Sequence, residues 1–426
     1  MKKLFLFLLS VFIMNAVFPQ LSINAELRPR TEFRNGYKSL NTSSNTPAML
    51  VSQRTRLAFG YSSDWLKSRI SFQDVREWGD ESRISSTGVF GDDASVDMNE
   101  AWVEMSFFNH SALKIGRQYF EYDDARLLAK RNWNQNSLSY DGLLYKYSNQ
   151  GWAVDAAVSL NNEEDNKFGQ EYPSGKFKTL DFLHIQKSLG DFSFSGLVLL
   201  TGITKNDTSE TLYTKGSFGM NINYKAESVL GFASLYYQCG KNARGMQVMA
   251  YNFNASGGYT WEKLRLTAGF SILSGNEPKL SDSVTPGVDR QFDLFYGARH
   301  RYYGEMDFFS NVSGSTGSAG LIDVFTIINF EISEKINAYL GYHYFANQYR
   351  IINKTTAEKL DVSLASEFDT GILVAFAKGV GLKGGVSALL ANQTLEVLQG
   401  VENKASSISS WFWLQLTVKP EFIFGK

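Results

Sequence analysis

Residues 411–419 read WFWLQLTVK, and apolar side chains in this stretch fall on every second position. One parity holds Phe412, Leu414, Leu416 and Val418. The other parity holds Trp411, Trp413, Gln415 and Thr417. Because the side chains of a β-strand alternate between its two faces, we expect one face of this strand to meet lipid and the other to meet a lumen.

The same alternation recurs in other parts of the chain. Residues 264–272 carry an apolar side chain on each even position, and residues 360–365 set Leu360, Val362 and Leu364 against more polar neighbours. A soluble β-sandwich, whose apolar face packs against a core, would give the same pattern. The aromatic content, a targeting segment and the chain length must therefore decide between a sandwich and a membrane barrel.

The composition favours the membrane barrel. Of 426 residues, 43% are hydrophobic and 14% are aromatic, yet the mean hydropathy is -0.22. Strands that alternate apolar and polar residues have a low mean hydropathy even when one face is fully apolar. Abundant aromatic residues are typical of the girdles at membrane interfaces. The formal net charge of -1 argues against a nucleic-acid-binding protein. A single cysteine, Cys239, excludes a disulfide framework within the chain.

The start of the chain has the features of a secretory signal peptide, because Lys2 and Lys3 precede an apolar run. No later stretch offers about 18 apolar residues, so helices that would stay in the inner membrane are not expected. We predict a signal peptide over residues 1–20 and a single domain over residues 21–426 in the bacterial outer membrane. At roughly 22 residues per strand with its connections, this domain is predicted to be all-β, a transmembrane antiparallel β-barrel of about 18 strands.

Polar and glycine-rich runs predict the connections between strands. Long loops are expected at residues 37–48, 79–97, 161–179, 276–296 and 309–320. Tight turns are expected at residues 62–65, 108–111, 148–151, 189–191 and 379–381. Two of the long loops, residues 161–179 and 276–296, are long enough to fold into the mouth of the barrel as a gate.

The first third of the chain carries arginines at a spacing that suits strands. Arg28, Arg30 and Arg34 share a parity, as do Arg54 and Arg56 on the next predicted strand. An arginine that faced lipid at mid-depth would cost about 2–4 kcal/mol, so these side chains should face the lumen. Planar guanidinium groups would there offer paired donors that match carboxylates.

Carboxylates follow on the neighbouring predicted strands. Arg69 falls on the parity opposite Ile70 and Phe72, and Glu100 and Glu104 share a parity against Ala101 and Val103. Arginines beside such carboxylates form either a wall that conducts a solute or a structural ion-pair ladder that stiffens the barrel. For each single residue both interpretations stay open.

Signatures of catalysis and metal binding are missing from the sequence. It contains neither HExxH nor GxSxG, and its four histidines, His110, His184, His300 and His343, show no ligand spacing. We therefore expect no enzymatic activity, no metal and no other cofactor. A hydrolase in the barrel wall that uses a lone serine and histidine is the remaining enzymatic alternative.

Read in order, three groups of short blocks resemble the alginate-export family of outer-membrane porins. The first group is QRTRL at residues 53–57. The second comprises EAWV at 100–103, LKIGRQ at 113–118, RNWNQ at 131–135 and YDG at 140–142. The third comprises LFYG at 294–297, HRYYG at 300–304 and MD at 306–307. Their order and spacing carry the resemblance, which spans the predicted barrel domain.

The resemblance implies a monomeric barrel whose narrowed lumen, lined by arginines with interspersed carboxylates, passes an anionic uronate polymer such as alginate. The alternating strands imply contact with outer-membrane lipid. If the channel exports the polymer, it would be expected to meet a periplasmic protein that delivers it. The arginines at matching positions are Arg54, Arg56, Arg69, Arg117, Arg126, Arg131 and Arg301. The carboxylates at matching positions are Glu100, Glu104 and Asp141. Arg117 shares its parity with Ile115, so it would need a bulge or a strand end to reach the lumen.

Two hypotheses stand ahead of the enzymatic one. The first is a passive channel that selects an anionic polysaccharide or oligosaccharide. The second is a general diffusion porin whose charges only shape a field across the pore. They differ in anion selectivity and in block by oligouronates. A passive channel follows the gradient of its solute, so the sequence leaves export and import open.

Overall fold

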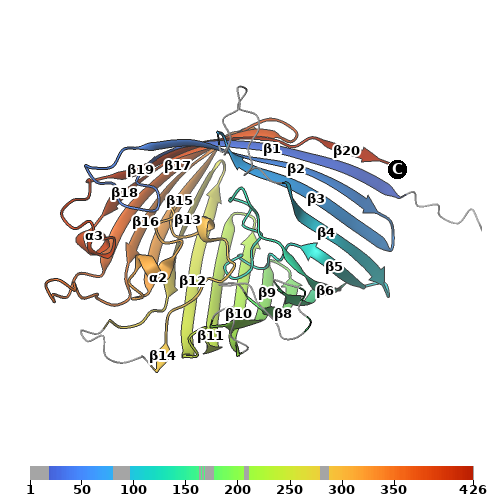
Figure 1. The fold of residues 1–426 in the computed structure, drawn as a ribbon. Helices are drawn as coiled ribbons and strands as arrows, with labels where there is room; N and C mark the ends of the chain where they lie inside the picture. Colours follow the sequence, from blue (N-terminus) through green and yellow to red (C-terminus); the bar gives the residue numbers. More distant parts are fainter. Residues whose placement is uncertain are drawn as a thin grey trace, which may run out of the picture.

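The computed structural model describes residues 19–79, 96–162, 165, 167, 177–205, 211–278 and 287–425. Within these ranges, 18 long strands form the wall of a closed antiparallel barrel (Figure 1). This confirms the predicted fold class and strand number. The predicted signal peptide lies outside the described residues except for its last two positions.

The strands follow one another around the wall in chain order. The first nine are β1 (Gln20–Asn35), β2 (Ala48–Ser62), β3 (Leu66–Glu77), β4 (Val96–Phe107), β5 (Ser111–Gln118), β6 (Tyr140–Asn149), β7 (Trp152–Leu160), β8 (Thr179–Leu189) and β9 (Phe192–Thr204). The next nine are β10 (Leu212–Ala226), β11 (Val229–Lys241), β12 (Gln247–Trp261), β13 (Leu264–Leu273), β15 (Leu321–Ser333), β16 (Ile336–Ala346), β17 (Ser363–Ala377), β18 (Val380–Ala391) and β19 (Ser409–Val418). The smaller elements are β14 (Val288–Asp289), η1 (Arg299–Arg301), α2 (Val312–Ser315), α3 (Gln393–Leu398) and β20 (Glu421–Phe424). No helix in the described ranges is long and apolar enough to cross a membrane.

The barrel closes where the first long strand meets the last. β1 pairs with β2 on one side and with β19 on the other, in a register that runs from Leu27 opposite Val418 to Asn35 opposite Ser410. Pro420 then interrupts the last strand, because proline has no N–H to donate to a ladder. The chain resumes as β20, which also pairs with β1. Closure leaves the wall without a free edge.

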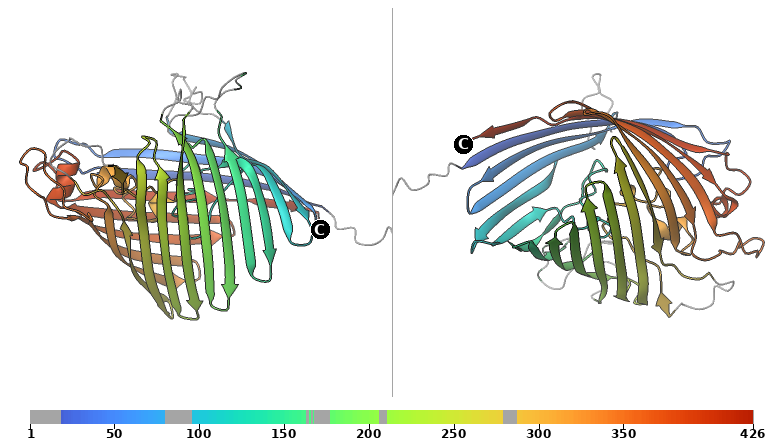
Figure 2. Two further views of the ribbon diagram at one scale, coloured as in Figure 1. Left: turned by 90° about the horizontal axis from the view of Figure 1, so that it is seen from below. Right: turned by 180° about the vertical axis from the view of Figure 1, so that it is seen from behind.

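The two ends of the barrel differ in the length of their connections. The tight turns lie at residues 63–65, 108–110, 150–151, 190–191 and 378–379, as predicted. The connections at the opposite end are longer, and those at residues 119–139 and 274–320 are among the longest. Figure 2 shows the strands side by side around the wall and the tight turns along one rim. The predicted loop at 79–97 falls mainly outside the described residues.

Alternation along the strands sorts the side chains as predicted for residues 411–419. Phe412 and Leu414 are 41% and 39% exposed on the outer face, whereas Trp411 and Trp413 are 1% and 5% exposed on the inner face. Large apolar residues cover the outer face of the other strands as well. The outer face therefore has the apolar surface that lipid requires.

The expectation for residues 360–365 is wrong. β17 begins only at Ser363, and the register shifts between Phe345 and Ala346 on the neighbouring strand. Leu360 precedes the strand and packs with Ile351 in a small cluster formed by the loops. Leu364 is fully buried instead of facing outward. The short alternation of apolar residues at 360–365 therefore results from packing between loops and not from a strand with an outer and an inner face.

A charge on the outer face should be costly at mid-strand. Met220, in the middle of β10, is 69% exposed among outward apolar residues. We expect Met220→Arg to lower the free energy of unfolding by about 2–4 kcal/mol, because the guanidinium would face lipid. Asn223→Arg is the matched control, since its side chain faces inward on the same strand. Urea titration in lipid vesicles measures both, and equal losses would contradict a lipid-facing Met220.

Candidate functional site

Two connections fold into the barrel and fill part of its interior. We call residues 119–139, between β5 and β6, loop A, and residues 290–320, before β15, loop B. Phe120 and Leu128 of loop A and Met306 of loop B are at most 1% exposed. They belong to one hydrophobic cluster with residues of the wall. The main core of the described chain therefore lies inside the barrel.

The two loops are bonded to each other along their main chains. The N–H of Ala298 donates to the carbonyl of Ala125 at 2.8 Å, and the N–H of Tyr296 donates to the carbonyl of Leu127 at 3.2 Å. The hydroxyl of Tyr302 donates to another carbonyl of loop A. Loops A and B consequently form one unit that narrows the interior.

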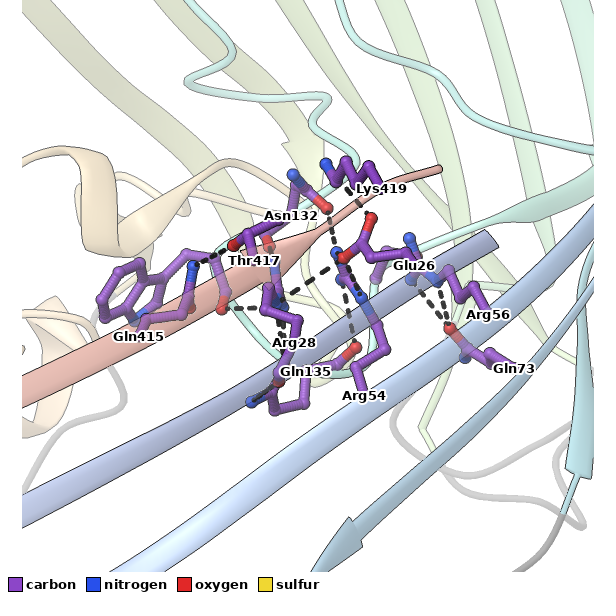
Figure 3. A network of polar contacts seen from close by, with 12 residues as sticks. Glu26, Arg28, Arg54, Arg56, Gln73, Asn132, Gln135, Gln415, Thr417 and Lys419 are labelled. Atoms are coloured by element: carbon purple, nitrogen blue, oxygen red, sulfur yellow. Dashed lines mark hydrogen bonds and ion pairs between the residues drawn. The ribbon is translucent and has the colours of Figure 1, made fainter. Parts of the chain in front are cut away.

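Three arginines of β1 and β2 hold loop A by its main chain, and Figure 3 shows two of them, Arg28 and Arg54. They donate to the carbonyl oxygens of the four consecutive residues 132–135. Arg28 donates to the first and third of these carbonyls at 2.7 and 2.8 Å. Arg30 donates to the second at 3.1 Å, and Arg54 donates to the fourth at 3.3 Å. All three side chains thus point inward, on the side that parity indicated.

The positive charge of these arginines is balanced within the wall. Arg54 is 0% exposed, and its guanidinium bonds the carboxylate of Glu26, which also lies 3.1 Å from Lys419. Arg30 bonds Glu32 at 3.0 Å. A buried charge is tolerated where it is paired and hydrogen-bonded. The donors of Arg54 are therefore directed at protein groups.

Arg56 also bonds loop A. Its guanidinium donates to Gln73 on β3 at 2.9 Å and to Ser137 at 2.6 Å. The side chain of Arg56 therefore joins the wall to the end of loop A that returns to β6.

A second group of predicted residues lies near the tight-turn end, on β3 to β6. Arg69 bonds Glu100 at 3.0 Å, and Lys146 bonds Glu104 at 3.1 Å. Lys114 stands over the ring of Trp102 at 3.8 Å. The side chains of Arg69 and Lys146 remain 32% and 41% exposed. We call these residues the turn-end patch.

Arg126 and Arg131 lie on loop A and fasten it to loop B. Arg126 is 4% exposed, bonds Asp124 at 2.9 Å and donates to the hydroxyl of Tyr303 at 2.7 Å. Arg131 donates to the carbonyls of Phe295 and Gly297 at 2.8 and 2.9 Å. Burial and the nearby Arg299 lower the pKa of Arg131. Positive charge thus accumulates where the two loops meet.

A cavity of about 520 Å³ opens where loops A and B meet. Its basic lining residues are Lys38, Lys130, Arg131, Arg299, His300 and Arg301. We call them the cationic seam. Its acidic lining residues are Glu121 and Asp307. Arg301 is exposed, and its side chain makes no hydrogen bond or ion pair with the described residues; its guanidinium lies 5.8 Å from the ring of Tyr302.

The acidic residues of the cavity are engaged by neighbours. Asp307 accepts from Tyr37 at 2.5 Å and lies 2.9 Å from His300. Burial raises the pKa of Asp307, but His300 and these hydrogen bonds outweigh it, and the net pKa is lowered. His300 also stacks on Trp133 at 4.0 Å between centroids. Lys38 lies 3.7 Å from Asp307 and Lys130 lies 3.3 Å from Glu121, so these two cations of the seam are partly neutralised. The guanidinium of Arg301 has no acidic partner among the described residues.

Arg117 and Asp141 lie on the outer face, so the expectation that they line the lumen is wrong. They bond each other at 2.7 Å, and their side chains are 42% and 52% exposed. The register keeps Arg117 on the same face as the exposed Ile115. Gly116 has a φ of 116°, but no register shift follows it. The bulge that would have turned Arg117 inward is not formed.

Sequence reasoning missed loop A as an element. The predicted gate at 161–179 falls largely outside the described residues, and the one at 276–296 reaches loop B only with its last positions. The missing alternation between residues 119 and 139 was the signal that could have revealed an irregular segment. The partners of its carbonyls come from strands about 80 to 110 residues earlier and follow from no local pattern.

A cluster of carboxyl groups, also missed, fixes loop B to β17. Glu367 is 0% exposed and accepts from the N–H of Met306 at 2.8 Å. Glu305 of loop B accepts from the hydroxyl of Tyr339. Burial and the neighbouring Asp369 raise the pKa of Glu305 to about 7. Loop B is thus attached through acids that are easily protonated.

The attachment of loop B should weaken as pH rises. Glu305 has a pKa of about 7 in the folded protein against an ordinary value of 4.5. Its stabilising contribution is therefore complete below the lower value and lost as pH rises through the upper one. We expect hydrogen exchange of loop B, corrected for the intrinsic rate, to increase roughly tenfold as the pH rises from about 4.5 to 7 and to level off above neutrality. Glu305→Gln should flatten this dependence and exposed Glu121→Gln should not; an unchanged slope in Glu305→Gln would refute the assignment.

Comparisons with solved structures agree with the barrel. OccAB1 of Acinetobacter baumannii has a TM-score of 0.63 and 11% identity over 95% of this chain and 97% of that chain. OccK3 (OpdO) of Pseudomonas aeruginosa has a TM-score of 0.61 and 13% identity over 94% and 96%. OpdK of the same organism, solved with vanillate, has a TM-score of 0.59 and 9% identity over 94% and 99%. At such identities the likeness shows the fold.

The sequence comparisons are more specific. No curated protein sequence matches the chain. The family profile described as "Alginate export", however, matches residues 19–357, which is well over half of the chain. Together with the barrel, this match places the protein in the bacterial outer membrane as a channel that belongs to the alginate export family.

Proposed function

We propose that this channel passively conducts an anionic saccharide, a uronate oligomer or polymer such as alginate, past the cationic seam. The observation that carries the proposal is the cavity between loops A and B, where Arg301 has no competing partner among the described residues. Free guanidinium donors in a confined space favour carboxylate ligands. At the other end of the path, the solute would pass the turn-end patch.

The chemistry of a uronate suits such a path. Each sugar carries a carboxylate, which can accept two parallel hydrogen bonds from one guanidinium. Lys130 lies 3.3 Å from Glu121 and Arg69 lies 3.0 Å from Glu100, so these cations are partly neutralised. Sites of moderate strength let a charged chain exchange partners as it slides. Conduction of this kind needs no catalysis and no cofactor, and a single barrel suffices for it.

A general diffusion porin is the second candidate function. The ion pairs of the turn-end patch favour it, because alternating charges on one wall set up a transverse field without selecting one solute. The structure of OpdK with vanillate supports an anionic solute of small size equally well. If the solute is a polymer delivered for export, a periplasmic protein would hand it to the tight-turn end.

Arg301 provides the test of solute recognition. In planar bilayers under a salt gradient, the refolded protein should be anion-selective, and oligouronates should block its current. Arg301→Gln should reduce the anion-to-cation permeability ratio by roughly a factor of two and weaken the block, because a free cation is removed. Arg117→Gln is the matched control on the outer face and should leave both unchanged. Weak selectivity without block in the unmodified protein would favour the general porin.

A further inference from the structure

One part of loop A bends toward β1 and β2. Its main-chain carbonyl oxygens are not paired with a neighbouring strand. Residues 132–135 lie in the interior, where each unpaired main-chain group is costly. Their four carbonyls accept hydrogen bonds from the arginine side chains of the wall. The guanidinium groups therefore substitute for a neighbouring strand.

The contact is reciprocal, and its arginine side chains are buried. The side chain of Gln135, which is 7% exposed, accepts from Arg28 at 3.0 Å and donates to Ser52 on β2 at 3.0 Å. Arg28 and Arg54 are 3% and 0% exposed. These guanidinium groups are thus shielded from a passing solute. Figure 3 shows the side chains of Arg28, Arg54 and Gln135 directed toward one another.

The position of the seam depends on this contact. Loop A carries Lys130 and Arg131, and Arg131 in turn holds the carbonyls of residues 295–297 in loop B. A displacement of residues 132–135 from the wall would move both loops. Such a movement would change the width of the opening before it changed the charge of any group.

We propose that Arg28 and Arg54 are positioning residues that set the width of the constriction by clamping residues 132–135 to β1 and β2. Neither residue contacts the solute. The proposal requires that the channel conducts, but it does not depend on which solute the channel selects. Its direct readout is the size of the opening, measured with an uncharged probe.

The experiment compares single-channel conductance and the size cut-off for neutral polyethylene glycols in refolded variants. Arg54→Gln and Gln135→Ala should both raise the conductance by roughly a factor of two and admit larger polymers, because each removes part of the clamp. Gln135→Ala is the decisive variant, since it removes no charge. Arg301→Gln is the matched control, which should alter the reversal potential and leave the polymer cut-off unchanged.

Two results would overturn the proposal. One is a Gln135→Ala channel with the conductance and cut-off of the unmodified protein. The other is an Arg54→Gln channel that loses anion selectivity at an unchanged cut-off, which would make Arg54 a solute-binding residue. If Arg54→Gln does not give a heat-modifiable folded barrel, Gln135→Ala alone decides. The polymer cut-off is informative even if oligouronates fail to block, so the two proposals can fail separately.

Discussion

The interior of this barrel depends on hydrogen bonds between wall arginines and loop carbonyls. A closed barrel of 18 strands encloses more space than the side chains of its own wall can fill. Loops A and B fill part of that space, but an irregular segment brings main-chain groups that no strand pairs. Arg28 and Arg54 supply fixed donors for residues 132–135, and loop A then supplies Arg131 to loop B. The chain thus builds a constriction from irregular segments without leaving these carbonyls unsatisfied.

This arrangement divides the inward arginines into two kinds. Arg54 is fully buried and its donors are used by protein acceptors, whereas Arg301 is exposed and has no polar partner among the described residues. A guanidinium whose donors are occupied cannot bind a passing carboxylate without breaking those bonds. Fewer arginines are therefore free to bind a solute than the number that point into the barrel. The cationic seam and the turn-end patch are better guides to the path.

The wall was predictable because each strand reports its own two faces. Trp411 and Phe412 fall on opposite faces as their parity indicates, and the same rule placed Arg28 and Arg54 inward. Parity says nothing about partners, however, and the partners of Arg28 lie more than 100 residues away on loop A. For Arg117 the parity with Ile115 was the correct signal, and the position implied by the resemblance was wrong because no bulge formed. The fold followed from local periodicity, whereas the site required contacts that only the closed barrel creates.

The two loops are held by chemistries that respond differently to their surroundings. Loop A is attached to the wall through arginine side chains that donate to its main-chain carbonyls. Loop B is attached to β17 partly through Glu305, whose pKa burial and Asp369 raise to about 7. A change in pH near neutrality therefore acts on the attachment of loop B through Glu305. Because Arg301 belongs to loop B, the exposed cation without a polar partner among the described residues lies on the loop whose attachment responds to pH. Loop A, clamped to β1 and β2, sets the width of the opening, whereas loop B carries the cation Arg301.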